Sequence, residues 1–444
     1  MKISTLSVLI MGGGVTGKAA AEALLPAAGR VAIYDEGKEK AMELKAAFPD
    51  VAVYDTVETV PFSEFTLLLK SPGIQPDHPL LLRAEQAGLP VWSDVELAYR
   101  LFPERTIAGV TGTNGKTTTT ALLCHIAAQE KTVHCLGNIG VGVLPAFFQG
   151  SDADLYIIEL SSFQLTHSPS LRVSVSGILN LSPDHINWHK SMEAYVAAKA
   201  RLLLQQEAED TAVINRDEPL LQEIAQQTRA KILPISLQEP VDGYYKEGEQ
   251  MMRRGKPFFA FSELQIPGLH NQQNALVATA MAESLGISDE AIKEGLRTFA
   301  GVAHRMEYIG ESHGIRFIND SKGTNVDASI KAVEALPYPI RLLAGGMDKK
   351  VSYLPLIEKL EGKVEKLYLY GETAALIRDT ALEFGFTRIE MFPGLEEAVK
   401  KAYADSAPND QILLSPASAS WDMYPNFETR GEHFRSIAKD LGVK

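Results

Sequence analysis

The segment Gly112-Thr113-Asn114-Gly115-Lys116-Thr117-Thr118 has the residue types and spacing of a loop that binds phosphate groups. A strand is expected over 106–110 and a helix after the loop, so backbone N–H groups and the helix dipole would face an anion. Lys116 would reach the β- and γ-phosphates of a nucleotide, and the Thr117 hydroxyl would bind magnesium. Val110 stands where the strict motif has glycine. This variant motif predicts nucleotide binding but no particular reaction, and a plain glycine turn is the alternative.

A second glycine-rich turn, Gly12-x-Gly14-x-x-Gly17, follows a strand expected over 8–11, and Asp35 ends the next expected strand. Taken alone, this pattern is that of a dinucleotide site with Asp35 on a ribose hydroxyl, which favours a nicotinamide- or flavin-dependent oxidoreductase. Two other interpretations stay open. The turn could simply pack a helix against a strand, or it could hold the diphosphate of another nucleotide. The second nucleotide loop on the same chain makes the last interpretation attractive.

Three further residue types could bind metal. Glu159 ends an apolar strand expected over 155–159, where it could bind magnesium or could be an ordinary acid before a helix. His185 and His189 are four residues apart, a spacing that zinc uses, but no third ligand stands nearby. Lys199 lies in a helical run, where an isolated lysine is usually exposed. The local pattern does not separate these interpretations.

Polar side chains later in the chain could contact a nucleotide. Asn271 and Asn274 are spaced to share one helix face, and their amides could read a purine edge or cap a helix. Arg305 follows His304, and Lys322 lies in Asn319-Asp320-Ser321-Lys322-Gly323-Thr324-Asn325. Ordinary surface charge is the alternative for both cations.

Alternating strands and helices must position these motifs. Strand-like runs over 8–11, 31–34 and 65–69 alternate with helical runs, and this β-α-β order predicts mostly parallel sheets with helices on both faces. In the last third of the chain, strands are expected over 316–318, 341–343, 366–369 and 411–414. With roughly 100–200 residues per domain, 444 residues suggest two to four domains. We expect three, with bounds 1–93, 94–301 and 302–444.

Composition excludes several classes of protein. The 43 Lys and Arg against 56 Asp and Glu leave a net charge of −13, which argues against nucleic acid or an anionic membrane as the main partner. No apolar run approaches the ~20 residues that span a bilayer. The two cysteines, Cys124 and Cys135, form no Cys-x-x-Cys pair. We therefore expect small buried thiols in a reducing cytoplasm, with neither a disulfide framework nor a thiolate zinc site.

Taken in order, these segments resemble the Mur ligases, which make the peptide stem of the bacterial cell wall. The resemblance covers essentially the whole chain and includes Glu159-Leu160-Ser161-Ser162-Phe163-Gln164-Leu165 beside the motifs above. It implies an α/β fold of three domains: a Rossmann-like N-terminal domain, a central P-loop-type ATPase domain with a mostly parallel sheet, and a Rossmann-like C-terminal domain. Ser71-Pro72-Gly73-Ile74 and the segments 414–422 and 426–431 are most similar to members that add D-glutamate to UDP-N-acetylmuramoyl-L-alanine.

The resemblance also assigns roles by position. The residues that would hold the uridine end of the substrate are Gly14, Val15, Thr16, Asp35, Ser71 and Gly73, with Asn138 near its phosphate or sugar. The residues that would bind ATP are the loop from Gly112 to Thr118 together with Asn271, Asn274, Arg305 and Asp320, the last four closing from a domain interface. Thr117 and Glu159 would bind one Mg²⁺, and His185 with a carbamylated Lys199 a second. The residues that would place D-glutamate are Thr324, Lys349, Ser420 and Phe427, with Lys350 an alternative to Lys349.

The implied activity is that of an ATP-dependent acid–amino-acid ligase. ATP would convert the alanyl carboxylate into an acyl phosphate, and the amine of D-glutamate would then displace phosphate, with Lys116, His185 and Lys199 as catalytic residues. We expect a cytoplasmic monomer that acts on small molecules. The alternatives are a sister ligase that adds another amino acid or acts on folate, the nicotinamide-dependent oxidoreductase, and a non-catalytic nucleotide-binding scaffold.

Overall fold

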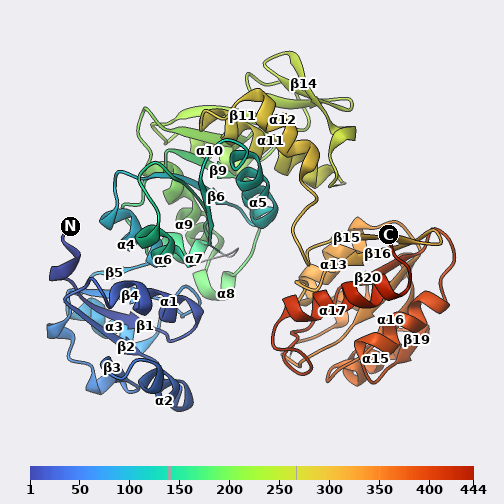
Figure 1. Cartoon of the computed structure of the whole chain (residues 1–444), viewed down its shortest axis with the longest axis horizontal. Coiled ribbons are helices and arrows are strands. Elements are labelled where there is room, and N and C mark those ends of the chain that lie inside the picture. The colour runs from blue at the N-terminus through green and yellow to red at the C-terminus, as the bar shows by residue number, and fades with distance from the viewer. Residues whose placement is uncertain (138–141, 267, 350) are drawn as a thin grey trace. The chain divides into compact units, whose positions relative to one another are not determined.

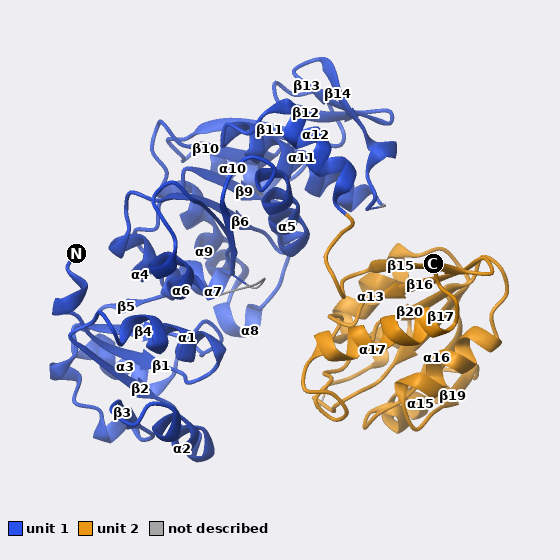
Figure 2. Ribbon diagram, viewed as in Figure 1, with its two compact units in different colours: residues 1–299 blue, residues 300–444 orange. Residues whose placement is uncertain are grey.

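A computed structural model of the chain describes residues 1–137, 142–266, 268–349 and 351–444 (Figure 1). These residues form two compact units, 1–299 and 300–444 (Figure 2). Unit 1 contains a five-stranded and a nine-stranded sheet, and unit 2 contains a six-stranded sheet. The predicted α/β class with mostly parallel sheets is confirmed, whereas the predicted domain bounds stay predictions. In the described ranges, no helix has the length and apolar character needed to cross a membrane.

The first sheet of unit 1 has the strand order β3-β2-β1-β4-β5, and all its strand pairs are parallel. Its strands are β1 (Ser7–Met11), β2 (Arg30–Tyr34), β3 (Ala52–Tyr54), β4 (Leu67–Lys70) and β5 (Val91–Trp92). Its helices are α1 (Val15–Leu24), α2 (Lys38–Ala47) and α3 (Pro79–Gln86). The strand order reverses between β1 and β4, so the loops after these two strands leave the same edge in opposite directions and open a crevice there.

The second sheet of unit 1 has the order β14-β13-β12-β11-β10-β9-β6-β8-β7, parallel from β7 to β12 and antiparallel from β12 to β14. Its strands are β6 (Thr106–Thr111), β7 (Val133–Leu136), β8 (Leu155–Glu159), β9 (Val175–Ile178), β10 (Thr211–Asn215), β11 (Lys231–Ser236), β12 (Tyr244–Glu247), β13 (Gln250–Arg253) and β14 (Lys256–Ala260). Its helices are α4 (Asp94–Leu101), α5 (Lys116–Ala127), α6 (Val143–Gln149), α7 (Ser162–Thr166), α8 (Ile186–His189), α9 (Met192–Leu204), α10 (Pro219–Ala225), α11 (Leu269–Ser284) and α12 (Asp289–Thr298). Burial on both faces explains the continuous apolar runs of β6 and β8.

One hydrophobic core joins the two sheets of unit 1. Leu24 of α1, Leu97 of α4 and Phe147 of α6 belong to the same buried cluster as Ile10 of β1 and Ile158 of β8. All five side chains are almost fully excluded from water, and each stabilises the fold by roughly 1.5–3 kcal/mol relative to an exposed side chain. The shared core therefore holds the strand ends of both sheets in one rigid body.

Unit 2 has the strand order β15-β16-β20-β17-β18-β19, parallel except for the antiparallel edge pair β15–β16. Its strands are β15 (Glu307–Ser312), β16 (Ile315–Asn319), β17 (Ile340–Ala344), β18 (Val364–Leu369), β19 (Ile389–Met391) and β20 (Gln411–Leu414). Its helices are α13 (Val326–Ala335), α14 (Leu354–Ile357), α15 (Ala374–Glu383), α16 (Leu395–Ala404) and α17 (Phe427–Asp440). The four strands expected here from sequence lie within β16, β17, β18 and β20.

The two cysteines differ from expectation. Cys124 of α5 and Cys135 of β7 form a disulfide, and Cys135 is only half-buried. The prediction of two unpaired buried thiols is therefore wrong. It rested on the absence of a repeated cysteine pattern, whereas the pairing arises because the turn after α5 folds β7 back beside that helix, with the two Cα atoms 6.0 Å apart.

We predict that reducing this disulfide lowers the free energy of unfolding of unit 1 by about 3 kcal/mol, because a short cross-linked loop restricts the unfolded chain. The measurement is the thermal unfolding midpoint with and without dithiothreitol. The Cys124→Ser, Cys135→Ser double variant is the control. Its unfolding midpoint should match that of the reduced protein and should not change when dithiothreitol is added. An unchanged midpoint for the fully reduced protein would contradict the prediction.

Candidate active site

The phosphate-type loop lies between β6 and α5, at the carboxyl edge of the nine-stranded sheet. Gly115 caps α5 with φ 82°, and a Cβ there would approach the Asn274 amide oxygen to 2.4 Å. Only glycine fits both conditions. The first turn of α5 carries no acidic residue, so its N–H groups and dipole are available to an anion. Thr113 is anchored from outside the loop, since its N–H donates to Asn180 O and its hydroxyl pairs with the Tyr195 hydroxyl at 2.8 Å.

Two ammonium groups converge on one carbonyl of this loop. Lys116 Nζ donates to Gly112 O at 2.9 Å, and Lys199 Nζ donates to the same oxygen at 2.8 Å. Lys199 also donates to Thr111 Oγ1 at 3.1 Å and lies over the Tyr195 ring. Its side chain is almost fully buried, and burial, then the charge of Lys116, lowers its pKa well below the usual value for lysine. The interpretation of Lys199 as an exposed helix lysine is wrong.

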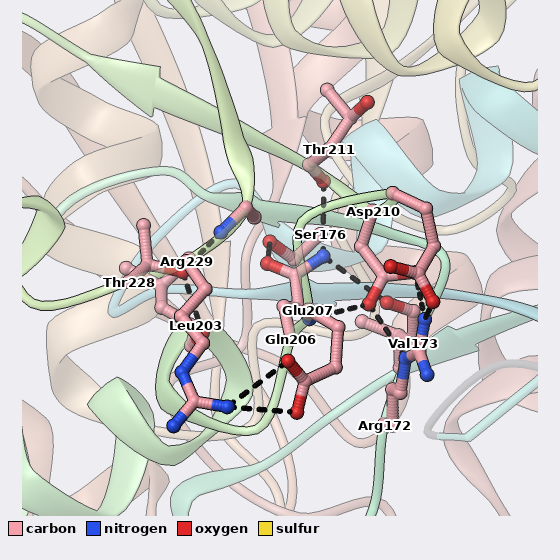
Figure 3. Close-up of polar contacts among 12 residues, drawn as sticks. Arg172, Val173, Ser176, Leu203, Gln206, Glu207, Asp210, Thr211, Thr228 and Arg229 are labelled. Carbon is pink, nitrogen blue, oxygen red and sulfur yellow. Dashed lines mark hydrogen bonds and ion pairs between the residues drawn. The ribbon is translucent and has the colours of Figure 1, made fainter.

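Figure 3 shows polar contacts around the C-terminal end of α9, the helix that carries Lys199. Gln206, just beyond the helix, donates to Val173 O and Thr211 O and accepts from Ser176 Oγ at 2.8 Å. Asp210 accepts from Arg172 Nε at 2.7 Å. These contacts tie the C-terminal end of α9 to the neighbourhood of β9 and β10, so the helix cannot slide along the sheet.

Glu159 ends β8, next to β6, and is almost fully buried. Its Oε2 atom is shielded from water and has no hydrogen-bond partner among the described residues. An unsatisfied buried carboxylate oxygen is costly in a folded protein but suits a divalent cation. No cluster of three or more His, Cys, Asp or Glu that could hold a metal occurs in the described ranges. A cation at Glu159 would thus need the Thr117 hydroxyl, phosphate oxygens or water to complete its coordination.

The two histidines after β9 have different surroundings. His185 is half-exposed, takes φ 54°, and lies 3.5 Å from Asp184 and against the Phe163 ring. His189 is buried with its Nε2 at 2.9 Å from Ser162 Oγ. Burial, then the charge of Lys199, lowers the pKa of His189 to about 4, so it is neutral at pH 7. His189 is thus engaged by Ser162, and the pair forms no zinc site.

A cavity of about 480 Å³ in unit 1 brings many of the predicted residues together. The predicted residues that line it are Val15, Thr16, Gly73, Lys116, Glu159, His185 and Lys199. They come from the start of α1, the loop after β4, the start of α5, the end of β8, the N-cap of α8, and α9, so the shared core of unit 1 places both sheets' strand ends on one cavity. Asn271 and Asn274 lie on α11 and bond each other at 3.1 Å, with Asn274 against Gly115. Asn138 lies outside the described residues.

The glycine turn after β1 is held by Asp35. The Asp35 carboxylate accepts from Gly13 N at 2.8 Å and from Gly37 N at 3.0 Å. A Cβ at Gly17 would come within 1.8 Å of Gly12 O, so this glycine is required for close packing of α1 on the turn. Ser71 reaches the same turn, donating its hydroxyl to Gly12 O at 3.3 Å.

Two buried charged residues, one of which lines the cavity, escaped the sequence reasoning. Lys70, the last residue of β4, is buried, donates to Ser71 O and Pro72 O, and lies 5.1 Å from the centre of the Trp188 ring. Burial lowers the pKa of Lys70 to about 8. Asp94 lines the cavity and accepts from Gln164 Nε2, and burial raises its pKa. The available signal was a charged residue at the end of an apolar strand for Lys70, and an acid two residues after a strand for Asp94.

Unit 2 gathers the remaining predicted residues at the carboxyl edge of its sheet. Asp320 follows β16 and accepts from Ser415 Oγ at 2.7 Å and Met306 N at 3.2 Å. Lys349 Nζ donates to Thr324 O at 2.9 Å. The other predicted residues lie on the loop after β20 (Ser420), at the start of α17 (Phe427) and before β15 (Arg305). Lys350 lies outside the described residues.

Comparison with known proteins finds two family models on this chain. The Mur ligase middle domain matches residues 110–282, and the Mur ligase glutamate ligase domain matches residues 304–418. Among curated proteins, UDP-N-acetylmuramoylalanine–D-glutamate ligase of Alkaliphilus oremlandii is 41% identical over 99% of this chain and all of that protein. The protein of the same name from Latilactobacillus sakei is 38% identical over 98% of this chain and 97% of its own length.

Solved structures share the fold at low sequence identity. A UDP-N-acetylmuramate–alanine ligase from Thermotoga maritima matches 98% of this chain and 99% of its own with a TM-score of 0.60 and 18% identity. MurF from Acinetobacter baumannii matches 78% of this chain and 79% of its own with a TM-score of 0.58 and 19% identity. At such identities the likeness concerns the fold alone.

Asp320 predicts a pH dependence of stability. Burial raises its pKa from 3.8 to about 7, so the folded protein favours the protonated form. Its contribution to stability is fully present below about pH 4 and is lost as the pH rises through about 7, a change on the order of 4 kcal/mol. Asp320→Asn, which stays neutral, should flatten the pH dependence of the unfolding midpoint between pH 5 and 8. Exposed Asp327→Asn is the control, and identical profiles for all three proteins would contradict this prediction.

Proposed function

This chain belongs to the Mur ligase family, and we propose that it joins D-glutamate to UDP-N-acetylmuramoyl-L-alanine with ATP as the energy source, in peptidoglycan precursor synthesis. The two relatives of this name described above align over 97–100% of their own length, which supports the assignment to this member of the family. The single structural observation that carries the proposal is the convergence of Lys116, Lys199 and Glu159 on the cavity that Thr16 and Gly73 also line.

Lys116 binds the phosphates of ATP through its ammonium group. Its ammonium now donates to two loop carbonyls, Gly112 O and Thr113 O, at 2.9 and 2.8 Å. Phosphate oxygens are stronger acceptors than these carbonyls, so ATP draws the ammonium toward the β- and γ-phosphates. Thr117 and Glu159 would hold a magnesium ion, which when bound neutralises phosphate charge so that a carboxylate can approach.

Lys199 is suited to carbamylation. Its lowered pKa favours the neutral amine, the form that adds to carbon dioxide to make an N–C bond and release one proton. The product is an anion in place of an ammonium, so it removes the repulsion between two cations at Gly112 O and attracts Lys116. The carbamate and His185 would then be the protein ligands of a second magnesium ion.

The reaction proceeds in two displacements. A carboxylate oxygen of the alanyl group attacks the γ-phosphorus of ATP, the bond to ADP breaks, and an acyl phosphate forms. The D-glutamate nitrogen attacks the acyl carbon to form the C–N bond and loses a proton, and the bond between the acyl carbon and the phosphate oxygen breaks, so that inorganic phosphate leaves with its electron pair. Donors aimed from Lys116 and the N-terminus of α5 stabilise the negative charge that gathers on the transferred phosphate. Thr324, Lys349, Ser420 and Phe427 are proposed to place D-glutamate.

We propose that the protein works as a monomer in the cytoplasm, with small-molecule partners, where ATP is available. Reducing conditions there would act on the Cys124–Cys135 disulfide. Assays should therefore include both redox forms of the protein.

The amino-acid specificity is tested by phosphate release from ATP and magnesium with UDP-N-acetylmuramoyl-L-alanine across a panel of amino acids. We expect release with D-glutamate and none above background with L-glutamate or D-aspartate. Release with another amino acid would keep the ligase chemistry and identify a sister ligase. Release with none, from folded protein, together with binding of a nicotinamide cofactor, would overturn the proposal in favour of an oxidoreductase.

We predict that Lys199→Ala lowers kcat by at least about 100-fold, because the variant lacks the proposed carbamate and therefore the negative charge that would hold magnesium beside the transferred phosphate. In wild-type protein, ¹³C-labelled bicarbonate should produce a carbamate signal by nuclear magnetic resonance, and removing carbon dioxide should lower activity reversibly. Lys231→Ala, at an exposed position of unit 1, is the control. A folded Lys199→Ala variant with full activity, or activity that ignores bicarbonate, would contradict the role.

A further inference from the structure

Arg430 is the largest side chain of the described residues that is fully buried. It lies in the first turn of α17, and its guanidinium makes five hydrogen bonds. Their acceptors are Ser321 Oγ at 3.0 Å, Ser321 O at 2.9 Å, Ser418 O at 3.3 and 3.2 Å, and Ala419 O at 3.3 Å. These use the planar fork of donors that distinguishes arginine from lysine.

All these acceptors are neutral, and no carboxylate of the described residues forms a direct ion pair with Arg430, although its charge acts on the nearby buried carboxyl of Asp320. The other deeply placed arginine of unit 2, Arg341, shows the usual arrangement, with Asp410 at 2.6 Å. A buried cation without a counter-ion is costly even when its N–H groups are satisfied. A buried charge of this kind is therefore a candidate for a role in function.

The hydrogen bonds of Arg430 connect segments that are far apart in sequence. Ser321 belongs to the loop after β16, and Ser418 and Ala419 belong to the loop after β20. The loop after β17 joins them, because Met347 N donates to Ala419 O and a Cβ on Gly346 would lie 3.2 Å from Arg430 Nη1. One guanidinium thus organises three neighbouring loops at the carboxyl edge of the sheet.

These loops carry the residues proposed to place the amino acid. Thr324 follows Ser321, Lys349 follows Gly346, and Ser420 follows Ala419 along the chain. Phe427 begins the helix of Arg430, and its carbonyl accepts from the Ser321 hydroxyl at 2.8 Å. A displacement of the guanidinium would therefore move all four residues together.

The charge of Arg430 also acts on one of the residues proposed to place the amino acid, Lys349. Partial desolvation, then the charge of Arg430, lowers the pKa of Lys349, whose ammonium donates to Thr324 O. Ala417, in the loop after β20, has φ 57°, a conformation that an alanine keeps only when its surroundings hold it. The loops thus hold two cations, Arg430 and Lys349, that form no direct ion pair with a carboxylate of the described residues, although the charge of Arg430 acts on the buried Asp320.

Resting on the proposed function, we propose that Arg430 is the positioning residue of the amino-acid site: it holds the three loops in place, and its buried charge selects a dicarboxylate amino acid. Arg430 itself does not touch the substrate, because its side chain has no exposed surface. A carboxylate of the bound amino acid is attracted by the charge of Arg430. The cost of removing water from this guanidinium arises during folding and does not have to be met again on binding.

The test uses the full chain with Arg430→Met, which removes charge and donors, and Arg430→Lys, which keeps the charge but loses the fork. Arg341→Lys is the matched control, since it alters a mostly buried arginine of the same unit, on β17, that has its own carboxylate. KM for the amino acid, KM for ATP, kcat and the unfolding midpoint are measured for each. For Arg430→Met we expect the KM for D-glutamate to rise by roughly 10- to 100-fold while the KM for ATP changes less than about threefold. Arg430→Lys should recover part of this loss.

Two results would overturn the inference: an unchanged KM for the amino acid in folded Arg430→Met, or equal rises in both KM values. If Arg430→Met does not fold, the test compares Arg430→Lys with Arg341→Lys. Only a rise in the KM for the amino acid that occurs in Arg430→Lys and not in Arg341→Lys, without an equal rise in the KM for ATP, then supports the inference. Wild-type specificity is determined first. If the wild-type protein ligates another amino acid, the proposed function fails at that step, and the KM of that amino acid then tests Arg430 separately.

Discussion

The arrangement of unit 1 depends on one electrostatic constraint: a buried and a half-buried lysine side chain both donate to a single backbone carbonyl. Lys116 and Lys199 both donate to Gly112 O, and Lys199 is almost fully excluded from water. Two cations at such a distance repel each other strongly where water does not screen them. Burial and the charge of Lys116 lower the pKa of Lys199, which reduces this repulsion, and an anionic ligand would reduce it further.

Tertiary anchors keep this unfavourable arrangement in place. The phosphate-type loop is tied to Asn180 and Tyr195 from outside, and α9 is fixed at its end by Gln206. The core that α1, α4 and α6 share with both sheets resists any separation of the strand ends. Preorganised donors that cannot relax toward each other remain available to a charged substrate, which is how such a site lowers a reaction barrier.

Unit 2 solves a similar problem with an arginine. Its loops leave the carboxyl ends of the adjacent strands β16, β20 and β17, as expected for a ligand site on an open α/β sheet. In place of a glycine-rich loop before a helix, the buried guanidinium of Arg430 binds the loops together through neutral acceptors. In both units folding positions a cation before an anionic ligand binds. Recognition of acidic groups at these sites is therefore compatible with an overall charge of −13.

The sequence by itself determined the α/β class, the strands that carry the site, and the motif residues from Gly112 to Thr118, because apolar periodicity and glycine spacing are local properties. It did not determine that Lys199 is buried, that Cys124 pairs with Cys135, or that Arg430 has no counter-ion. These properties depend on which distant segments meet: β7 folds back on α5, α9 packs beside the loop after β6, and α17 crosses three loop ends. Burial and charge pairing are sums over such neighbours, so only the tertiary structure decided them.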